Sequence, residues 1–261
     1  MTTAQHEQQL RDGYDAFHRA RARSTCVARL YAEAMGDAYP VEVAPHSSCD
    51  WPLLGTLAGQ LRLNPGELLV DAGCGTGGVG LWLARSLSAS LLGIDISPVA
   101  VDLATARRAA FVAPERATFR VATLTVTGLP DAQAHGLVCI DALGNAPDRT
   151  AALRELHRIL RPGGRAVITR AVRRTLHPLV LDQEEAAGFS VEQVGERPGE
   201  PAMWARLYRL WIAHEAELRR ELGSNQAQNM LTEANRMLPL LAGRRSLVVT
   251  LRRPPDPTAP Q

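Results

Sequence analysis

The residues best suited to chemistry lie in a glycine-rich turn that follows an apolar run. Residues 69–80 read LVDAGCGTGGVG. Glycine has no Cβ, so the main chain of such a turn is bare, and a ligand can lie directly on its N–H groups before the next helix begins. An acidic residue, Asp95, ends the next apolar run, SLLGID. Together these features predict a site for a nucleotide-type ligand.

Two kinds of nucleotide ligand compete for this pattern. The stretch GTGGVG at residues 75–80 matches the dinucleotide pattern GxGxxG, and Asp95 lies 20 residues after Gly75, where an acid binds a ribose. However, Asp71 stands at the predicted strand end, two places before Gly73. A carboxylate there repels a pyrophosphate and attracts an ammonium group. The pattern Asp-x-Gly-x-Gly-x-Gly therefore favours a cationic ligand.

This pattern resembles motif I of class I methyltransferases that use S-adenosylmethionine (SAM). The resemblance continues through GIDIS at 93–97, VCIDAL at 138–143 and LRPGGRAVI at 160–168, and it covers about residues 65–196. It implies a Rossmann-like α/β sheet of seven strands, the last of them antiparallel, with SAM as cofactor. The overall pattern is similar to that of bacterial small-molecule methyltransferases of specialised-metabolite pathways in GC-rich organisms.

The resemblance implies roles for the residues of the predicted cofactor site. Asp95 would accept hydrogen bonds from both ribose hydroxyls, and Asp71 would either meet the cofactor ammonium or order the loop. Tyr14 would cover the site from an N-terminal lid helix, or pack on the core as an ordinary amphipathic residue. The remaining residues predicted to contact the cofactor are Gly73, Cys74, Gly75, Gly77, Ile96, Thr123, Leu124 and Asp141.

One stretch departs from the family pattern. After the third strand the family commonly has an acid that binds the adenine amino group, and here residues 122–125 read ATLT. Thr123 can accept one hydrogen bond, so we expect apolar walls and backbone to hold most of the adenine. A weaker hold on the cofactor is the expected consequence.

Candidate catalytic residues are few. Methyl transfer from a sulfonium is an in-line displacement, which needs alignment and exclusion of water, and a neutral acceptor also needs a base. His177, in the loop after the fifth strand, and His46, just before the core, are the candidate bases, although both also fit exposed loop side chains. Asp141, at the end of the fourth strand, is the third candidate as a residue that lines the site. The seven histidines show no metal-ligand spacing, so no metal is expected.

From residue 67 onward, short apolar runs alternate with amphipathic stretches, which predicts parallel strands joined by helices. Ser97 before Pro98, and Asp148, are predicted N-caps, and Arg161-Pro162-Gly163-Gly164 turns the chain into the fifth strand. The predicted strands are 68–72, 90–95, 117–122, 136–141, 165–171, 189–195 and 245–252, and the predicted helices are 78–87, 98–111, 148–160 and 179–187.

Two regions interrupt or precede this alternation. Residues 1–64 are predicted to form a helical N-terminal cap, and residues 65–253 the SAM-binding core. Within that core, residues 203–242 are predicted to form two long amphipathic helices broken at 223–225. Because insertions at the carboxyl edge of a parallel sheet commonly cover a ligand, we expect 203–242 to form part of a substrate lid. The last residues, 254–261, read PPDPTAPQ and predict a disordered tail.

Composition excludes several function classes. The chain has 261 residues with 29 basic and 27 acidic side chains, and all basic ones are Arg, so the net charge is +2. Such a balance predicts no nucleic-acid or membrane partner. Without Lys there is no Schiff-base or pyridoxal-phosphate lysine. The first residues lack the apolar core of a signal peptide, and no apolar run approaches the roughly 18 residues of a membrane span, so we expect a cytoplasmic protein.

The sequence therefore predicts SAM-dependent methyl transfer to a small organic molecule in a lidded apolar pocket, in natural-product biosynthesis. One alternative is a methyltransferase-like fold repurposed for a non-methylating reaction such as cyclisation. A non-catalytic SAM-binding protein is a further alternative, and a nicotinamide oxidoreductase a more distant one. A homodimer is a candidate assembly. The identity of the acceptor, and whether oxygen, nitrogen or carbon is methylated, are left open by the sequence.

Overall fold

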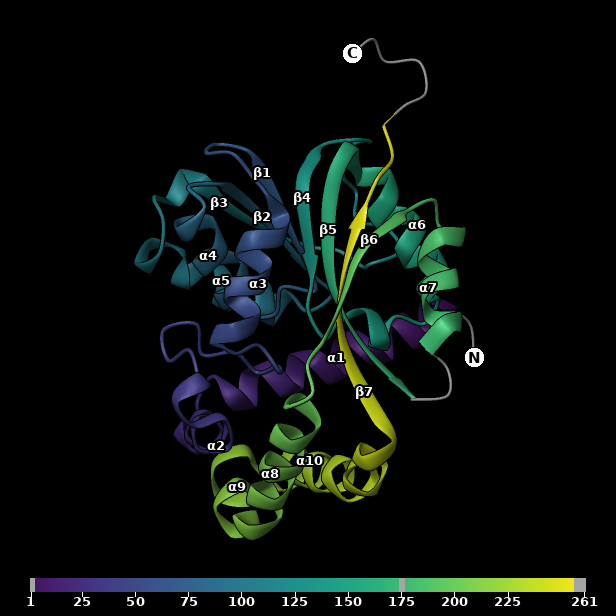
Figure 1. Cartoon of the computed structure of the whole chain (residues 1–261). Coiled ribbons are helices and arrows are strands. Elements are labelled where there is room, and N and C mark those ends of the chain that lie inside the picture. Colours follow the sequence, from purple (N-terminus) through teal and green to yellow (C-terminus); the bar gives the residue numbers. More distant parts are fainter. Residues whose placement is uncertain (1–2, 174–176, 256–261) are drawn as a thin grey trace.

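The computed structural model describes residues 3–173 and 177–255. Its centre is a seven-stranded sheet in the order β3-β2-β1-β4-β5-β7-β6 (Figure 1). The strands are β1 Leu68–Ala72, β2 Ser90–Asp95, β3 Ala117–Val121, β4 Ala134–Cys139, β5 Leu160–Arg173, β6 Ser190–Glu196 and β7 Arg244–Arg252.

The strand directions confirm the predicted fold class. Strands β1 to β5 pair in parallel, whereas β7 runs antiparallel to both β5 and β6. The order reverses beside β1, because β2 lies on one side of it and β4 on the other. The carboxyl ends of β1, β2 and β4 therefore meet at a topological switch point, where open α/β sheets bind ligands.

Helices cover both faces of the sheet. On one face, buried leucines of α3 Trp51–Leu61 and α4 Gly78–Ser86 pack against β1, β2 and β4. On the other face, Leu153, Leu156 and Ile159 of α6 Arg149–Ile159 pack with Phe189 against the same strands. Helices α5 Pro98–Arg107 and α7 His177–Ala186 complete the core. The predicted N-caps are confirmed: the side chains of Ser97 and Asp148 accept from Ala100 N and Ala151 N.

Some predicted boundaries were wrong. β4 ends at Cys139, not at 141, and β5 begins at Leu160 and runs to Arg173, well beyond the predicted 165–171. β5 begins early because Leu160 already pairs with Ala134 of β4. A register shift between Ala134 and Gly136, with Gly163 at φ +79°, makes residues 161–164 bulge within the strand. The predicted helix 98–111 ends at Arg107 and continues as a short 3₁₀ turn.

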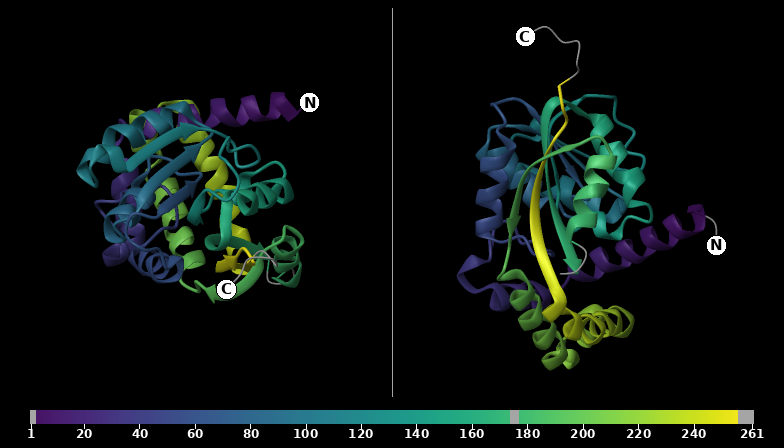
Figure 2. Two further views of the ribbon diagram at one scale, coloured as in Figure 1. Left: turned by 90° about the horizontal axis from the view of Figure 1, so that it is seen from above. Right: turned by 45° about the vertical axis from the view of Figure 1, so that its right-hand side comes forward.

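A second layer of helices lies beyond the carboxyl edge of the sheet (Figure 1). It consists of α2 Thr25–Met35, α8 Glu200–Ala213, α9 Glu215–Leu222 and α10 Ser224–Met237, which share a separate apolar cluster around the buried Leu30, Leu207 and Trp211. We call these four helices the lid layer. Helix α1 Thr3–Arg21 runs between the sheet and the lid layer, and its first turns project to one side (Figure 2).

The prediction of two long helices in 203–242 was wrong. The structure has three helices there, because the chain also breaks at His214, which ends α8 and precedes α9. The predicted break at Gly223 is confirmed, with φ +79° at that residue. The division of the chain into a cap and a core as domains stays a prediction.

Short 3₁₀ helices occupy several connections. They are η1 Gly36–Ala38, η2 Arg108–Ala110, η3 Pro114–Arg116, η4 Leu143–Asn145 and η6 Leu238–Gly243. None of the helices in residues 3–173 and 177–255 has the length and hydropathy needed to cross a membrane. Most of the predicted tail, residues 256–261, lies outside the described residues.

Candidate active site

A cavity of about 970 Å³ lies between the carboxyl ends of the strands, helix α1 and the lid layer. Its sheet end is lined by Asp71, Gly73, Gly75 and Asp95, and its lid end by aromatic side chains from α1, α2 and α8. Pockets that bind small molecules commonly measure about 300–1,000 Å³. The cavity is therefore large enough to hold a cofactor and a second small molecule together.

The glycine turn after β1 has the conformation that the sequence predicts. Gly73, Gly75 and Gly77 all have positive φ, at +78°, +51° and +76°. A Cβ on Gly73 would lie 2.3 Å from Ala142 Cβ, which no side chain tolerates. Gly77 is the N-cap of α4 and faces Ala104 and the Phe119 ring instead of lining the cavity. Its requirement for glycine is therefore a packing requirement, and direct cofactor contact by Gly77 has no support in the geometry.

Asp95, at the end of β2, is the best-formed polar group of the sheet end. Its Oδ2 accepts from Gly75 N at 2.8 Å and its Oδ1 accepts from Ser97 N at 2.9 Å. It is only 9% exposed, and burial raises the carboxyl pKa while the Ser97 and Gly75 N–H groups lower it. Each carboxylate oxygen keeps a second lone pair. Asp95 can therefore accept two further hydrogen bonds from a diol within the cavity.

Asp71 is turned toward helix α4. Its Oδ2 accepts from Gly80 N at 3.0 Å, and a Cβ on Gly80 would approach that oxygen to 2.6 Å. Burial is the main cause that raises the Asp71 pKa to about 7, assisted by the charge of Asp95. This contact supports the loop-ordering role, whereas the predicted contact with a ligand ammonium stays a prediction.

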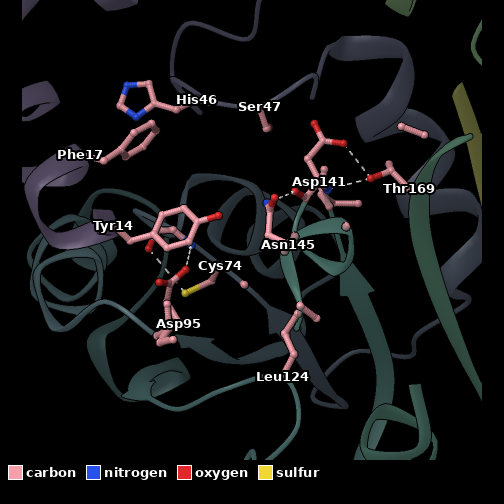
Figure 3. A pocket seen from close by; sticks show the side chains of 18 of the residues that line it. Tyr14, Phe17, His46, Ser47, Cys74, Asp95, Leu124, Asp141, Asn145 and Thr169 are labelled. Atoms are coloured by element: carbon pink, nitrogen blue, oxygen red, sulfur yellow. Dashed lines mark hydrogen bonds between the residues drawn. The ribbon is translucent and has the colours of Figure 1, made fainter. Parts of the chain in front are cut away.

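Tyr14 lies over the sheet end from helix α1. Figure 3 shows its ring next to Asp95 and Cys74. Burial and the Asp95 charge raise the Tyr14 pKa to about 12. Asp15 ties the same turn of α1 to the sheet, because its Oδ1 accepts from the Ser97 hydroxyl and, at 3.4 Å, from Val99 N. The helix is thus anchored where the predicted lid residue points into the cavity.

The side of the cavity predicted for adenine is mostly apolar. Ile96, Ala122, Leu124 and Ala142 line it. The Thr123 hydroxyl is already used within its own turn, since it accepts from Val126 N at 3.0 Å and bonds the Thr125 hydroxyl at 3.1 Å. Thr123 is therefore a weaker adenine partner than the sequence suggested.

Asp141 does not end a strand but lies two residues beyond β4, with φ +54°. Its Oδ2 accepts from Ser48 N at 2.7 Å and its Oδ1 from the Thr169 hydroxyl at 2.9 Å. These bonds join the loop before α3 to β4 and β5, and Asp141 faces the cavity together with Asn145 (Figure 3). A carboxylate engaged in this way holds the cavity wall in place.

The two predicted bases lie on different elements, His46 in the loop before α3 and His177 at the start of α7. His46 lies in the cavity wall against Phe17 and Tyr31, with ring centroids 6.2 and 6.0 Å away. Burial and the nearby Arg21 charge hold its pKa well below the usual range, so its imidazole is neutral and weakly basic. His177 is the first residue of α7 and not part of a loop, and its side chain lies outside the described residues.

Sequence reasoning missed several cavity residues, including two on helix α1. His18 is 6% exposed and its Cε1 would lie 3.7 Å from a Cβ on Gly75, directly against the glycine turn. Arg21, one turn further along α1, is 5% exposed and also lines the cavity. The signal was their position at helical spacing after Tyr14, on a face shared by Phe17. That signal becomes useful only when it is known that α1 crosses the sheet edge.

The lid end combines packing and lining. Leu207 is fully buried and Trp211 is 1% exposed within the lid cluster, and Trp204, Tyr208 and Trp211 also line the cavity. The Trp204 Nε1–H donates to Glu200 at 2.8 Å, and the Tyr208 hydroxyl donates to Glu233 at 3.0 Å. The aromatic side chains of α8 therefore pack in the lid cluster and line the cavity at the same time.

Comparison with known proteins identifies the core. Residues 70–168, from the middle of β1 into β5, match a family described as a methyltransferase domain. These residues therefore resemble a methyltransferase domain. The match includes the glycine turn, Asp95 and Asp141, so the sheet end of the cavity lies within it.

Relatives extend this likeness. A 27-O-demethylrifamycin SV methyltransferase of Amycolatopsis mediterranei is 31% identical over 157 residues, which are 60% of this chain and 56% of the relative. The chain thus spans little more than half of that relative's length. The [4+2]-cyclase SpnF has the same fold, with a TM-score of 0.75, 21% identity, and coverage of 96% of this chain and 97% of SpnF. A methyltransferase of Geobacter sulfurreducens in complex with S-adenosylhomocysteine has a TM-score of 0.63 and 20% identity, with coverage of 86% and 98%.

The cavity's own chemistry is compatible with SAM, the cofactor of this domain class. The acidic groups at its sheet end, Asp71, Asp95 and Asp141, suit a ligand that carries positive charge. Asp95 offers free lone pairs to a ribose, and the bare turn at Gly73 and Gly75 leaves room for a ligand on the main chain. No cluster of metal-binding side chains was found in the described part of the chain.

Proposed function

We propose that this protein binds SAM at the sheet end of the cavity and transfers its methyl group to a small organic molecule held at the lid end, as a step of natural-product biosynthesis. The observation that carries this proposal is the single cavity that joins Asp95 and the glycine turn to Trp204, Tyr208 and Trp211. When bound, SAM supplies an electrophilic methyl group on a sulfonium cation.

The chain's own residues would do three things. Asp95 would hold the ribose, and the main chain at Gly73 and Gly75 would carry the methionyl part. Tyr14 and His18, on helix α1, would cover the cofactor and exclude water. The apolar groups at Ile96 and Leu124 would enclose the adenine. Because the lid layer and α1 form the opposite wall, the acceptor would be aligned by aromatic contacts and not by a covalent bond.

The titratable groups of the described cavity favour an acceptor that ionises easily. Burial is the main cause that lowers the His18 pKa to about 4, and His46 lies well below its usual range as well. Both imidazoles are neutral at pH 7 and are weak bases, and Asp141 is engaged by Ser48 and Thr169. An acceptor that is already anionic at neutral pH requires no strong base.

A second candidate function is cyclisation without methyl transfer. The likeness to the [4+2]-cyclase SpnF extends over nearly the whole of both chains and so includes the lid layer, whereas the methyltransferase family match covers only the sheet core. In that case the aromatic lid end would fold a flexible substrate, and SAM would be bound without being consumed.

Calorimetric titration with SAM, S-adenosylhomocysteine and NAD is the first test. We expect binding of the first two and none of NAD, and a cavity that binds NAD alone would contradict the proposal. Incubation with methyl-labelled SAM and a panel of extracts that contain natural-product precursors then separates the two functions. A labelled product supports methyl transfer, while a new product without label supports cyclisation.

A further inference from the structure

Two buried donors at the lid end of the cavity have no partner. Arg21, the last residue of α1, and Trp211, on α8, are 5% and 1% exposed. Arg21 Nη1 and Trp211 Nε1 find no hydrogen-bond acceptor among the described residues. Both side chains line the cavity. Buried N–H groups are nearly always satisfied, so these two indicate an acceptor that comes from outside the chain.

The charge of Arg21 is also unbalanced. A guanidinium stays protonated, and buried arginines are usually paired with an acid. None of the ion pairs within the described ranges includes Arg21. Its Cζ lies instead 3.6 Å from the centroid of the Phe17 ring and 5.8 Å from that of Trp211. Cation–π contacts hold the guanidinium in place without neutralising it.

Neighbouring groups do not complete the pair. Burial is the main cause that lowers the Arg21 pKa, while the Tyr31 phenol, which hydrogen-bonds the guanidinium, and the Glu233 carboxylate raise it. Glu233 Oε1 accepts the Tyr208 hydroxyl at 3.0 Å and makes no ion pair with Arg21 within 4 Å. A bound anion would offset the cost of burying the guanidinium.

The donors define the chemistry of the missing partner. Arginine and tryptophan side chains donate and do not accept, so the partner must bring hydrogen-bond acceptors, and an anionic one would also balance the Arg21 charge. A guanidinium binds a carboxylate through two parallel hydrogen bonds. The rings of Phe17, Tyr31 and Trp211 surround the same part of the cavity and fit a flat apolar body.

The position of Arg21 separates this subsite from the cofactor region. Tyr14, His18 and Arg21 lie on one face of α1, and Tyr14 and Arg21 are about 10 Å apart along the helix axis. Tyr14 stands over Asp95 and His18 lies against Gly75, whereas Arg21 reaches the lid aromatics. A group bound at Arg21 therefore belongs to the second molecule in the cavity.

We propose that the substrate is a small organic acid with a flat apolar body, and that Arg21 together with Trp211 Nε1–H binds its carboxylate. This inference rests on the proposed function, since it concerns the molecule that shares the cavity with SAM. Arg21 sets specificity for the acid over its neutral analogues.

The test uses 2-naphthoate and its neutral analogue 2-naphthamide as probes, titrated into the full-length protein saturated with S-adenosylhomocysteine. We expect the wild type to bind naphthoate at least about tenfold more tightly than naphthamide. Arg21→Gln should reduce this preference to within about twofold, and Arg21→Lys should retain about a threefold preference because it keeps the charge but not the planar fork. Trp211→Phe should weaken naphthoate binding about threefold.

The matched control is Arg23→Gln, which removes the same charge from an exposed residue just after α1 and should keep the full preference. Titration of S-adenosylhomocysteine and circular dichroism are measured on each variant. Loss of S-adenosylhomocysteine binding by the wild type would overturn the proposed function itself. Intact cofactor binding with equal or undetectable affinity for the two probes would overturn only the substrate inference, as would a preference that survives Arg21→Gln. If Arg21→Gln does not fold, the Arg21→Lys preference decides.

Discussion

The two ends of the cavity are built on different principles. At the sheet end, main-chain N–H groups and acidic side chains form the wall, and each acid is held by hydrogen bonds, as with Asp95 between Gly75 N and Ser97 N. At the lid end, the wall consists of aromatic rings from three helices around Arg21, which forms no ion pair within the described part of the chain. The sheet end is acidic and tightly constrained, whereas the lid end carries the Arg21 charge and depends on side-chain packing.

This difference indicates which end is general and which is specific. The sheet end depends on the φ angles of the glycine turn and on the strand order, and most of it lies within the residues matched to the methyltransferase family. The lid end is assembled from α1, α2 and α8, which lie outside the residues matched to the family. Differences in substrate between relatives are therefore expected at the lid end, while the cofactor stays the same.

The largest effect is expected from the close packing around the sheet end, which leaves no room for an added Cβ. Gly80→Ala would bring a Cβ within 2.6 Å of Asp71 Oδ2 and 3.0 Å of Leu91. We expect it to lower the free energy of unfolding by about 1–3 kcal/mol through overpacking. The control is Gly55→Ala, in an exposed helical position with open space around it, which should raise stability by about 0.5–1 kcal/mol. Urea unfolding measures both, and equal effects would refute the distinction.

The ribose role of Asp95 gives the next largest effect. Asp95→Ala is expected to weaken SAM binding at least about tenfold, or about 1.4 kcal/mol, because two acceptor oxygens are lost. Calorimetry measures the dissociation constant. Asp102→Ala removes an exposed acid from the following helix and should leave it unchanged. If Asp95→Ala leaves the SAM dissociation constant unchanged, Asp95 does not bind the ribose.

Helix α1 connects the two ends, and Tyr14 tests that connection. Tyr14→Ala should weaken SAM binding about fivefold, since it removes the ring over the sheet end. Tyr14→Phe should retain nearly all of the affinity if the ring covers the cofactor by contact. A similar loss in both variants would assign the effect to the hydroxyl group instead.

The smallest effect at neutral pH is expected for Asp71→Asn. The Asp71 pKa is raised to about 7, so its carboxyl is partly protonated at that pH and the amide is a close substitute. Because the folded pKa lies above the unfolded one, the stability that the protonated carboxyl contributes is fully present below about pH 4 and is lost as pH rises through 7. The cost of Asp71→Asn should therefore be smaller at pH 8 than at pH 5. Urea unfolding at the two pH values measures this, and a cost that grows with pH would contradict it.

Much of the sheet end was predictable from local sequence. The glycine turn requires positive φ at Gly73 and Gly75, and Ser97 and Asp148 cap their helices through hydrogen bonds within three residues. Such features depend on neighbours along the chain, so the sequence alone indicates them. Boundaries were missed where distant contacts decide, as at the end of β5, where Val172 and Arg173 pair with Arg245 and Arg244 of β7.

The sequence by itself determined the α/β class and the acidic turn that suits a cationic ligand, and its resemblance to methyltransferases implied the antiparallel last strand. Only the tertiary structure decided which side chains face that ligand and its neighbour. His18 and Arg21 lie on α1, whose amphipathic pattern does not indicate which apolar surface the helix packs against. The role of each residue depends on where α1 crosses the sheet edge. The sequence likewise gives no sign that the Asp141 carboxylate is engaged. In the structure it accepts the N–H of Ser48, which lies 93 residues away in the sequence. Contacts between residues so far apart depend on how the layers pack, and no local pattern in the chain encodes that packing.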